Sequence, residues 1–189
     1  RAETIDDYKS GRELIIVLID IISRGGNLLL DIGPTGDGRI PTIMEERLLE
    51  IGNWMAINGE AIYGTRPWKT SRQWTKGEIP KVEYGHEYMV KYSVMDVVKE
   101  PTDGKAAVEA FFTKKGNDLY AIFPRWPQDG SLMIKDVRAS SKTKISLLGM
   151  DGNLKYKSKE KSVTVELPVL TNTSKLDHAA YVIKLTDVK

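Results

Sequence analysis

Carboxylates are the side chains of this 189-residue sequence that could do chemistry, and Asp31 holds the most informative position. It ends an apolar run within a glycine-rich segment, residues 25–38. If residues 27–32 form a parallel strand, Asn27, Leu29 and Asp31 share one face. Asp31 then lies at the carboxyl end of the strand, where barrel enzymes place their chemistry. A carboxylate there must be hydrogen-bonded or hydrated. We expect Asp31 to orient a substrate-binding group more than to contact substrate itself.

A structural role competes with this interpretation, because the glycines also let the chain enter and leave a buried strand. The segment has neither of the common glycine-rich phosphate-binding motifs. Glycoside hydrolysis needs two carboxylates about 5–9.5 Å apart. The adjacent pairs Asp6-Asp7 and Glu45-Glu46 lie on polar stretches and are expected to be solvated, and Asp31 with Asp37 flanks a turn. No catalytic residue is therefore assigned within this sequence.

Metal and thiol chemistry is not indicated. The sequence contains no Cys and only two His, His86 and His178, which excludes a disulfide framework and a Cys nucleophile. We expect both His to be surface or packing residues, and we expect no metal site built on them.

Charge and hydropathy exclude two further classes of partner. Lys plus Arg is 28 and Asp plus Glu is 26, so the net charge of +2 gives no basic excess for nucleic acid. The most apolar run, residues 14–22, contains Asp20 and is about half as long as a membrane crossing requires.

Three tryptophans, Trp68, Trp74 and Trp126, occur in loop-like contexts. Exposed aromatic rings can stack on sugars, but a Trp in a connecting segment more often packs two domains together. Asn172-Thr-Ser174 is a formal N-glycosylation acceptor. Lysines alternate along residues 155–161, which indicates a solvated strand edge that discourages aggregation.

The first part of the sequence predicts a helix, a strand and a second helix. Ser10 and Glu13 have capping-box spacing at the start of a helix over residues 10–24, whose apolar side chains cover most of its surface. Residues 27–32 predict a strand buried on both faces, and residues 35–38 a turn. Thr42 and Glu45 predict a second capping box for a helix over 42–58, ended by a left-handed cap at Asn58-Gly59.

After residue 60 the pattern changes to short β-type runs. Residues 66–87 are rich in Gly, Pro, Lys and Trp and predict a connector. The runs that follow predict an antiparallel sandwich; they are 107–113, 119–123, 132–137, 144–149, 154–156, 162–167 and 180–185. Asp151-Gly152-Asn153 predicts a hairpin turn between residues 145–148 and 154–156.

The fold class is thus α/β plus all-β. One strand and two helices cannot close a sheet, and a (β/α)₈ barrel needs about 250 residues. The absence of a starting Met makes Arg1 look like a cut. We therefore expect the partner strands of residues 27–32 to lie in a segment upstream of Arg1.

The block Ile22–Pro41 resembles the last barrel strand and following loop of the retaining α-L-fucosidases, glycoside hydrolase family 29. Residues Asn58–Trp68 resemble the exit from the last barrel helix of that family. The runs 119–123, 144–149 and 181–185 are similar to its C-terminal β-sandwich. One departure is Asp31, because many members carry Asn there.

The resemblance implies that residues 1–65 end a catalytic (β/α)₈-like barrel, 66–87 form a connector and 88–189 a β-sandwich. It implies an exo-acting enzyme that removes terminal α-L-fucose from glycans with retention and without a metal or organic cofactor. The Asp nucleophile and the Glu acid/base would both lie in the upstream barrel segment. The alternatives are a non-catalytic glycan-binding or scaffold module, and a hydrolase of another sugar. The absence of Cys fits a periplasmic or cytoplasmic bacterial enzyme. We expect a periplasmic or secreted bacterial protein rather than a lysosomal one.

Overall fold

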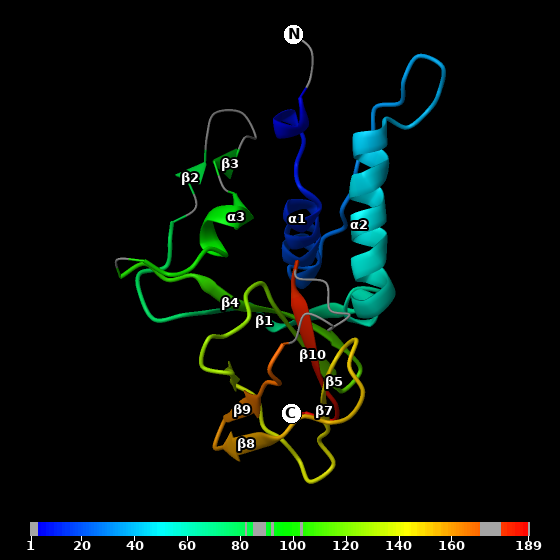
Figure 1. Cartoon of the computed structure of the whole chain (residues 1–189). Helices are drawn as coiled ribbons and strands as arrows, with labels where there is room; N and C mark the ends of the chain where they lie inside the picture. The colour runs from blue at the N-terminus through cyan, green and yellow to red at the C-terminus, as the bar shows by residue number, and fades with distance from the viewer. Residues whose placement is uncertain are drawn as a thin grey trace.

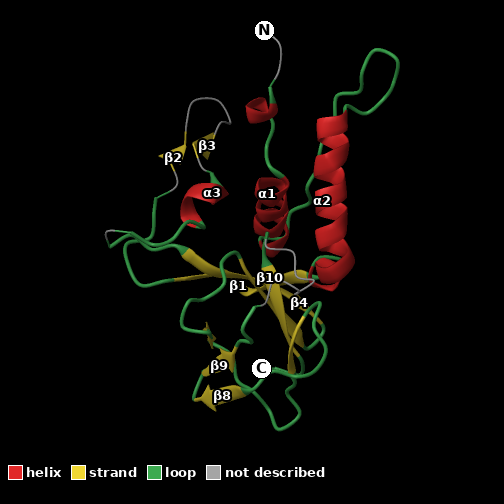
Figure 2. Ribbon diagram, in the orientation of Figure 1, coloured by secondary structure: helices red, strands yellow, loops and turns green. Residues whose placement is uncertain are grey.

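The chain is arranged in three layers, with helices on one face of a five-stranded sheet and a three-stranded sheet on the other (Figures 1 and 2). The computed structural model describes residues 4–81, 83–84, 90–91, 93–102, 104–170 and 179–188. Within these ranges, the side chains of Asp6, 83–84 and 90–91 are not described. His86, His178 and Asn172 lie outside the described residues.

The first long helix confirms the predicted helix over residues 10–24. The helices of the described residues are η1 (Ile5–Asp7), α1 (Gly11–Ser23), α2 (Thr42–Asn58), η2 (Gly59–Ala61) and α3 (Val94–Val97). The Ser10 hydroxyl accepts a hydrogen bond from the Glu13 backbone N–H at 3.2 Å, as the capping box predicts. The Glu13 carboxylate instead pairs with the Lys9 ammonium at 2.6 Å.

The ends of α2 correct two predictions. Pro41, not Thr42, is the N-cap residue, and no side chain caps the helix there. The fixed φ of Pro41, −57°, is already suited to the start of a helix. Gly59 is not a left-handed cap, because its φ of −59° is right-handed and the chain continues into η2. The left-handed residue comes later, at Gly64 (φ 69°).

Residues 27–32, predicted as a strand, are extended in the structure but belong to no strand. They are also not buried on both faces, because Leu29 is 93% exposed. A strand needs a neighbour to satisfy its backbone groups, and the described residues provide none for this segment.

The five-stranded sheet is antiparallel with strand order β1-β4-β5-β10-β7, and the three-stranded sheet has the order β6-β9-β8. The strands are β1 (Arg66–Trp74), β4 (Val108–Lys115), β5 (Asp118–Phe123), β6 (Ser131–Lys135), β7 (Ile145–Leu147), β8 (Tyr156–Lys159), β9 (Ser162–Glu166) and β10 (Tyr181–Leu185). Two short strands, β2 (Glu83–Tyr84) and β3 (Val90–Lys91), pair separately. The antiparallel, sheet-rich C-terminal part is confirmed.

Strand β1 overturns part of the predicted connector. Residues 66–74 pair antiparallel with β4, in a ladder that begins at Arg66 opposite Lys114. The sequence of β1 is mostly polar because it is an edge strand, and only Gln73 within it is fully buried. Polar edge strands lack the apolar alternation by which strands are recognised.

The predicted hairpin at Asp151-Gly152-Asn153 is also wrong. Strand β7 pairs with β10 and strand β8 pairs with β9, so the turn carries the chain from one sheet to the other. One backbone hydrogen bond crosses it, from Leu154 N–H to the Ile145 carbonyl at 2.7 Å. Strand β8 is the outer strand of its sheet, and its lysines are exposed, as predicted for a solvated edge.

Strand β5 shows how the sheet is buried on both faces. Leu119, Ala121 and Phe123 belong to the core between the two sheets. Tyr120 and Ile122 belong to the core between the sheet and the helices. Alternation of side chains along a strand sends successive residues to opposite faces, so a strand apolar at every position must lie in a middle layer.

Gln73 connects the edge strand β1 to the second sheet. Its side-chain N–H group donates to the Met133 carbonyl at 2.6 Å and to the Glu109 carboxylate at 2.8 Å. Its side-chain oxygen accepts from the Lys135 N–H at 2.9 Å. A buried amide satisfied in this way links the sheets without leaving an unpaired polar group.

Two polar contacts attach the helices to the sheet. The Trp54 indole N–H of α2, fully buried, donates to the Ala180 carbonyl at 2.9 Å. Asp20, the charged residue within the apolar run of α1, is buried and pairs with Arg72 of β1 and with Arg24. The Arg72 guanidinium also lies 5.6 Å from the centre of the Phe111 ring.

A second charged cluster lies where η2 meets the sheet. The Tyr120 hydroxyl donates to the Glu60 carboxylate at 2.8 Å, and the Lys184 ammonium bonds to the same oxygen. Lys184 also lies 3.3 Å from Asp118. The hydrogen bond from Lys184 lowers the pKa of Glu60, whereas burial raises the pKa of Tyr120 to about 12.

Replacement of Asp20 by Ala is expected to lower the free energy of unfolding by about 3 kcal/mol, because the largely buried Arg72 guanidinium loses its ion pair with the Asp20 carboxylate. Urea titration followed by circular dichroism measures this. Asp37→Ala, at an exposed ion pair with Arg39, is the control and should cost less than about 1 kcal/mol. Equal effects at the two positions would contradict the assigned role of Asp20.

The Glu60 cluster predicts a specific pH dependence. Because its pKa is lowered in the folded state, the charged Glu60 stabilises the fold above the ordinary pKa of 4.5, and this is lost as pH falls through the lowered value. Glu60→Gln should therefore be less stable than the parent at neutral pH, by less than about 1 kcal/mol at this partly exposed site, and the gap should close below pH 4.5. Glu166→Gln, 3.9 Å from Lys157 on the exposed edge, should show little gap at either pH.

Candidate functional site

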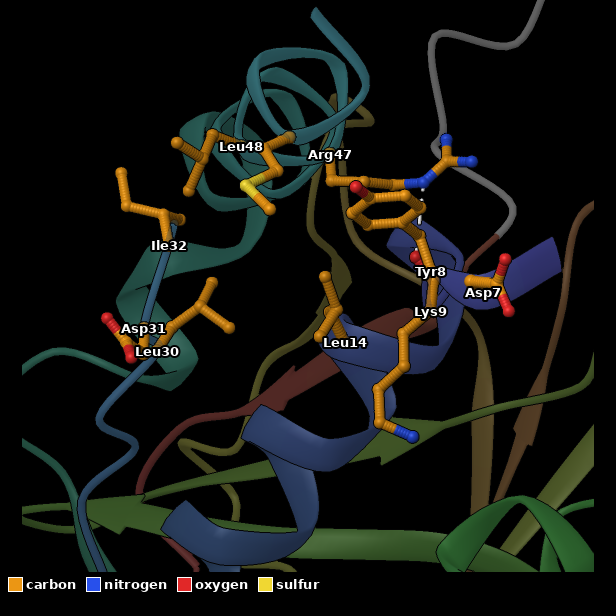
Figure 3. Close-up of a pocket in the computed structure, with 10 residues that line it drawn as sticks. Asp7, Tyr8, Lys9, Leu14, Leu30, Asp31, Ile32, Arg47 and Leu48 are labelled. Carbon is orange, nitrogen blue, oxygen red and sulfur yellow. Dashed lines mark hydrogen bonds between the residues drawn. The ribbon is translucent and has the colours of Figure 1, made fainter. Parts of the chain in front are cut away.

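Asp31, the predicted site residue, lines a pocket of about 190 Å³ between α1, α2 and two extended segments (Figure 3). One segment contributes residues 7–9 and the other residues 30–32. Most of the surface between them is apolar and comes from Leu14, Leu30, Ile32, Met44 and Leu48. Asp31 itself is exposed.

The direction of the 27–32 segment is set by the end of α1. The Gly25 N–H donates to the Ile22 carbonyl and the Gly26 N–H to the Ile21 carbonyl, both at 2.9 Å. Gly25 has a left-handed φ of 85°, which completes a Schellman motif. A Cβ atom on Gly25 would also lie 2.9 Å from Pro67. Gly25 and Gly26 therefore end α1 and turn the chain back alongside the two helices.

Arg47 of α2 fixes the position of the segment that contains Lys9, on the other side of the pocket. Its side-chain Nε–H donates to the Lys9 carbonyl at 3.1 Å, which is the dashed line in Figure 3, and its guanidinium pairs with Glu50 at 2.8 Å. This contact joins segments 38 residues apart in the chain. No sequence motif marks Arg47 as a link between these two segments.

The pocket does not bring together the carboxylate pair that hydrolysis of a glycoside requires. Its two carboxylates, Asp7 and Asp31, lie at opposite ends in Figure 3, and both are exposed. Glu45 and Glu46 are exposed, as predicted. Asp37 is engaged in its own turn, where hydrogen bonds from Thr35 and Arg39 lower its pKa. Asp31 makes no hydrogen bond or ion pair with the other described residues.

The three tryptophans are packed rather than freely exposed. The Trp68 ring meets Phe112 edge-on at 5.0 Å, and the Trp126 ring meets Tyr181 edge-on at 4.8 Å. Trp74 packs against the core between helices and sheet. These contacts favour the predicted packing role.

Two other kinds of site can be assessed for the described residues alone. In that part of the chain, no three His, Asp or Glu side chains gather as a metal ion would require. None of the helices there is long and apolar enough to cross a membrane.

Comparison with known families gives two matches that together cover both parts of the chain. A model described as α-L-fucosidase matches residues 1–60. A model described as the α-L-fucosidase C-terminal domain matches residues 104–186.

Individual proteins agree with these models. The tissue α-L-fucosidase of Homo sapiens is 36% identical over 190 residues, which cover 100% of this chain and 34% of that protein. The α-L-fucosidase of Dictyostelium discoideum is 33% identical over 193 residues, covering 99% of this chain and 35% of its own length. The chain thus spans about a third of the length of these relatives.

A solved structure shares the fold. The α-fucosidase of Thermotoga maritima, in complex with a mechanism-based inhibitor, matches 98% of this chain and 36% of its own with a TM-score of 0.69 and 28% identity. Sequence and structure therefore agree that the chain belongs to the α-L-fucosidase family and corresponds to the C-terminal part of its members.

Proposed function

We propose that this chain is the closing part of a retaining α-L-fucosidase that removes terminal α-L-fucose from glycans. In this proposal residues 1–65 end the catalytic barrel, and the C-terminal sandwich begins with β1 instead of at residue 88. The nucleophile and the acid/base come from barrel residues that are not among the 189 of this sequence. The fucosidase names of the relatives support the reaction and the substrate class.

The observation that carries the proposal is the state of residues 27–32. They run extended beside two helices, as a barrel strand does, but without a strand partner among the described residues. Leu29 is 93% and Leu30 37% exposed. Full burial of a leucine side chain stabilises a fold by about 1.5–3 kcal/mol. Neighbouring barrel strands on both sides would supply that burial.

Missing barrel strands would also explain the pocket between α1 and α2. Leu14, Met44 and Leu48 give it an apolar lining, and nearby Leu49 on the outer surface of α2 is 60% exposed. In a barrel, helices pack on the strands that they flank. We propose that the completed barrel fills this pocket, so that its inner surface is a packing surface and not a substrate site.

Asp31 would then lie at the carboxyl end of the last strand, on the catalytic side of the barrel. Its carboxylate makes no hydrogen bond or ion pair with the other described residues, so it is available to a neighbouring side chain. We propose that the Asp31 carboxylate accepts a hydrogen bond from a side chain that binds fucose. A module without catalysis is less well supported, because the fucosidase model matches residues 1–60 and not only the sandwich.

A longer form of the protein that includes the whole barrel is expected to hydrolyse an aryl α-L-fucoside, and the 189-residue chain is expected not to. The reason is that retention requires two carboxyl groups about 5–5.5 Å apart, and no such pair is present in the pocket. A panel of aryl glycosides measures the sugar preference. A well-folded longer form that leaves the fucoside intact, or prefers another sugar, would refute the proposal.

Within that longer form, Asp31→Ala should lower kcat/KM by about tenfold, since a misplaced binding group loses alignment with the substrate. Asp31→Asn should retain most of the activity, because an amide oxygen still accepts a hydrogen bond. Asp37→Ala, in the adjacent exposed turn, is the matched control and should leave kcat/KM unchanged. Full activity in Asp31→Ala would remove Asp31 from the site.

A further inference from the structure

A second pocket lies on the sandwich, at the edge where the two sheets meet. Its lining comes from the ends of β1 and β5, from β4 and β6, and from the loop after α3; the main contributors are Glu100, Pro101, Glu109, Arg125, Trp126 and Gln128. Its volume of about 140 Å³ is several times the roughly 30 Å³ that one water occupies in the liquid. It therefore has room for a ring-sized ligand.

Part of the lining of this pocket, which we call the Trp126 pocket, is apolar. Trp126, Pro101, Pro127 and Leu132 contribute it. Trp126 is held rigidly, because its ring packs on Tyr181 at 4.8 Å and on Phe123 at 5.7 Å. A fixed aromatic wall gives a ligand contact area at little cost in side-chain entropy.

The rest of the lining offers both donors and acceptors. The Trp126 indole N–H makes no hydrogen bond within the described part of the chain. Gln73 donates to only one oxygen of Glu109, at 2.8 Å, which leaves the second oxygen able to accept. Gln128 is exposed and carries both functions.

The charges of the pocket disfavour an anionic ligand. Among the described residues that line it, Arg125 is the one cation, and it is already committed to the Val98 carbonyl and to Glu100, whose carboxylate lies 3.6 Å from its Nε. Burial lowers the pKa of Arg125. Glu100 and Glu109 give the pocket two carboxylates against one guanidinium, so a phosphate or carboxylate ligand would be repelled.

We infer that the Trp126 pocket is a carbohydrate-binding site, which takes one neutral pyranose residue of a glycan. A pyranose has an apolar C–H face and a rim of hydroxyls that both donate and accept, which matches a lining that combines apolar side chains with unpaired donors and acceptors. The inference concerns binding by the sandwich and does not depend on hydrolysis.

The test titrates the full 189-residue chain separately with lactose and with methyl α-L-fucoside. Saturation-transfer NMR on the sugar measures affinity, and the indole N–H signals of the four Trp report the location. At least one sugar should saturate the protein and shift the Trp126 signal. No saturable transfer from either sugar would overturn the inference.

Variants give the decisive comparison. Trp126→Phe keeps a ring against Phe123 and Tyr181 but removes the indole N–H, so binding should weaken about fivefold. Trp68→Phe changes a Trp of the same core that does not line the pocket, and should bind like the parent. Gln128→Ala alters an exposed residue and should also weaken binding, even if Trp126→Phe does not fold. Unchanged affinity in Gln128→Ala, or equal losses in both Trp variants, would contradict a site here.

Discussion

The whole architecture depends on a sheet that is apolar on both faces. Strands β5 and β10 carry apolar side chains at almost every position, so each face must be covered by another layer. The three-stranded sheet covers one face and the helices cover the other. The same requirement applies to α1, whose Ile15, Ile16 and Ile19 are buried on the sheet while Leu14 and Leu18 stay only partly buried. The unsatisfied apolar surface is thus on the side of α1 and α2 away from the sheet, where residues 27–32 lie.

Apolar burial holds the layers together, but it does not fix the position of the helices on the sheet. A few buried polar contacts fix that position. Asp20–Arg72 joins α1 to β1, and Trp54 joins α2 to the start of β10. Such buried polar contacts add little net stability over an apolar pair, but they penalise any arrangement that leaves them unpaired. They explain how two helices keep a defined position on the sheet even with one side uncovered.

Much of this fold could be predicted from the sequence, because local signals agreed with tertiary contacts. The Ser10 cap reports an interaction between near neighbours in the chain, and so does the end of α1 at Gly25-Gly26. Strand β1 could not be predicted, since its stability comes from pairing with β4 and from Gln73, whose partners lie 36 to 62 residues away. The hairpin prediction failed for a related reason: the turn at residues 151–153 is local, but the pairing of β7 with β10 is not.

In the candidate site, too, the local feature could be predicted from the sequence and the distant pairing could not. Asp31 was predicted at a strand end and lines a pocket, but residues 27–32 pair with no strand among the described residues. The most direct measurement of the central claim is amide hydrogen exchange at Leu28–Asp31, in the 189-residue chain and in a longer form with the complete barrel. The account predicts rapid exchange in the chain and strong protection in the longer form, where strands pair on both sides. Rapid exchange in both would show that residues 27–32 are not a barrel strand.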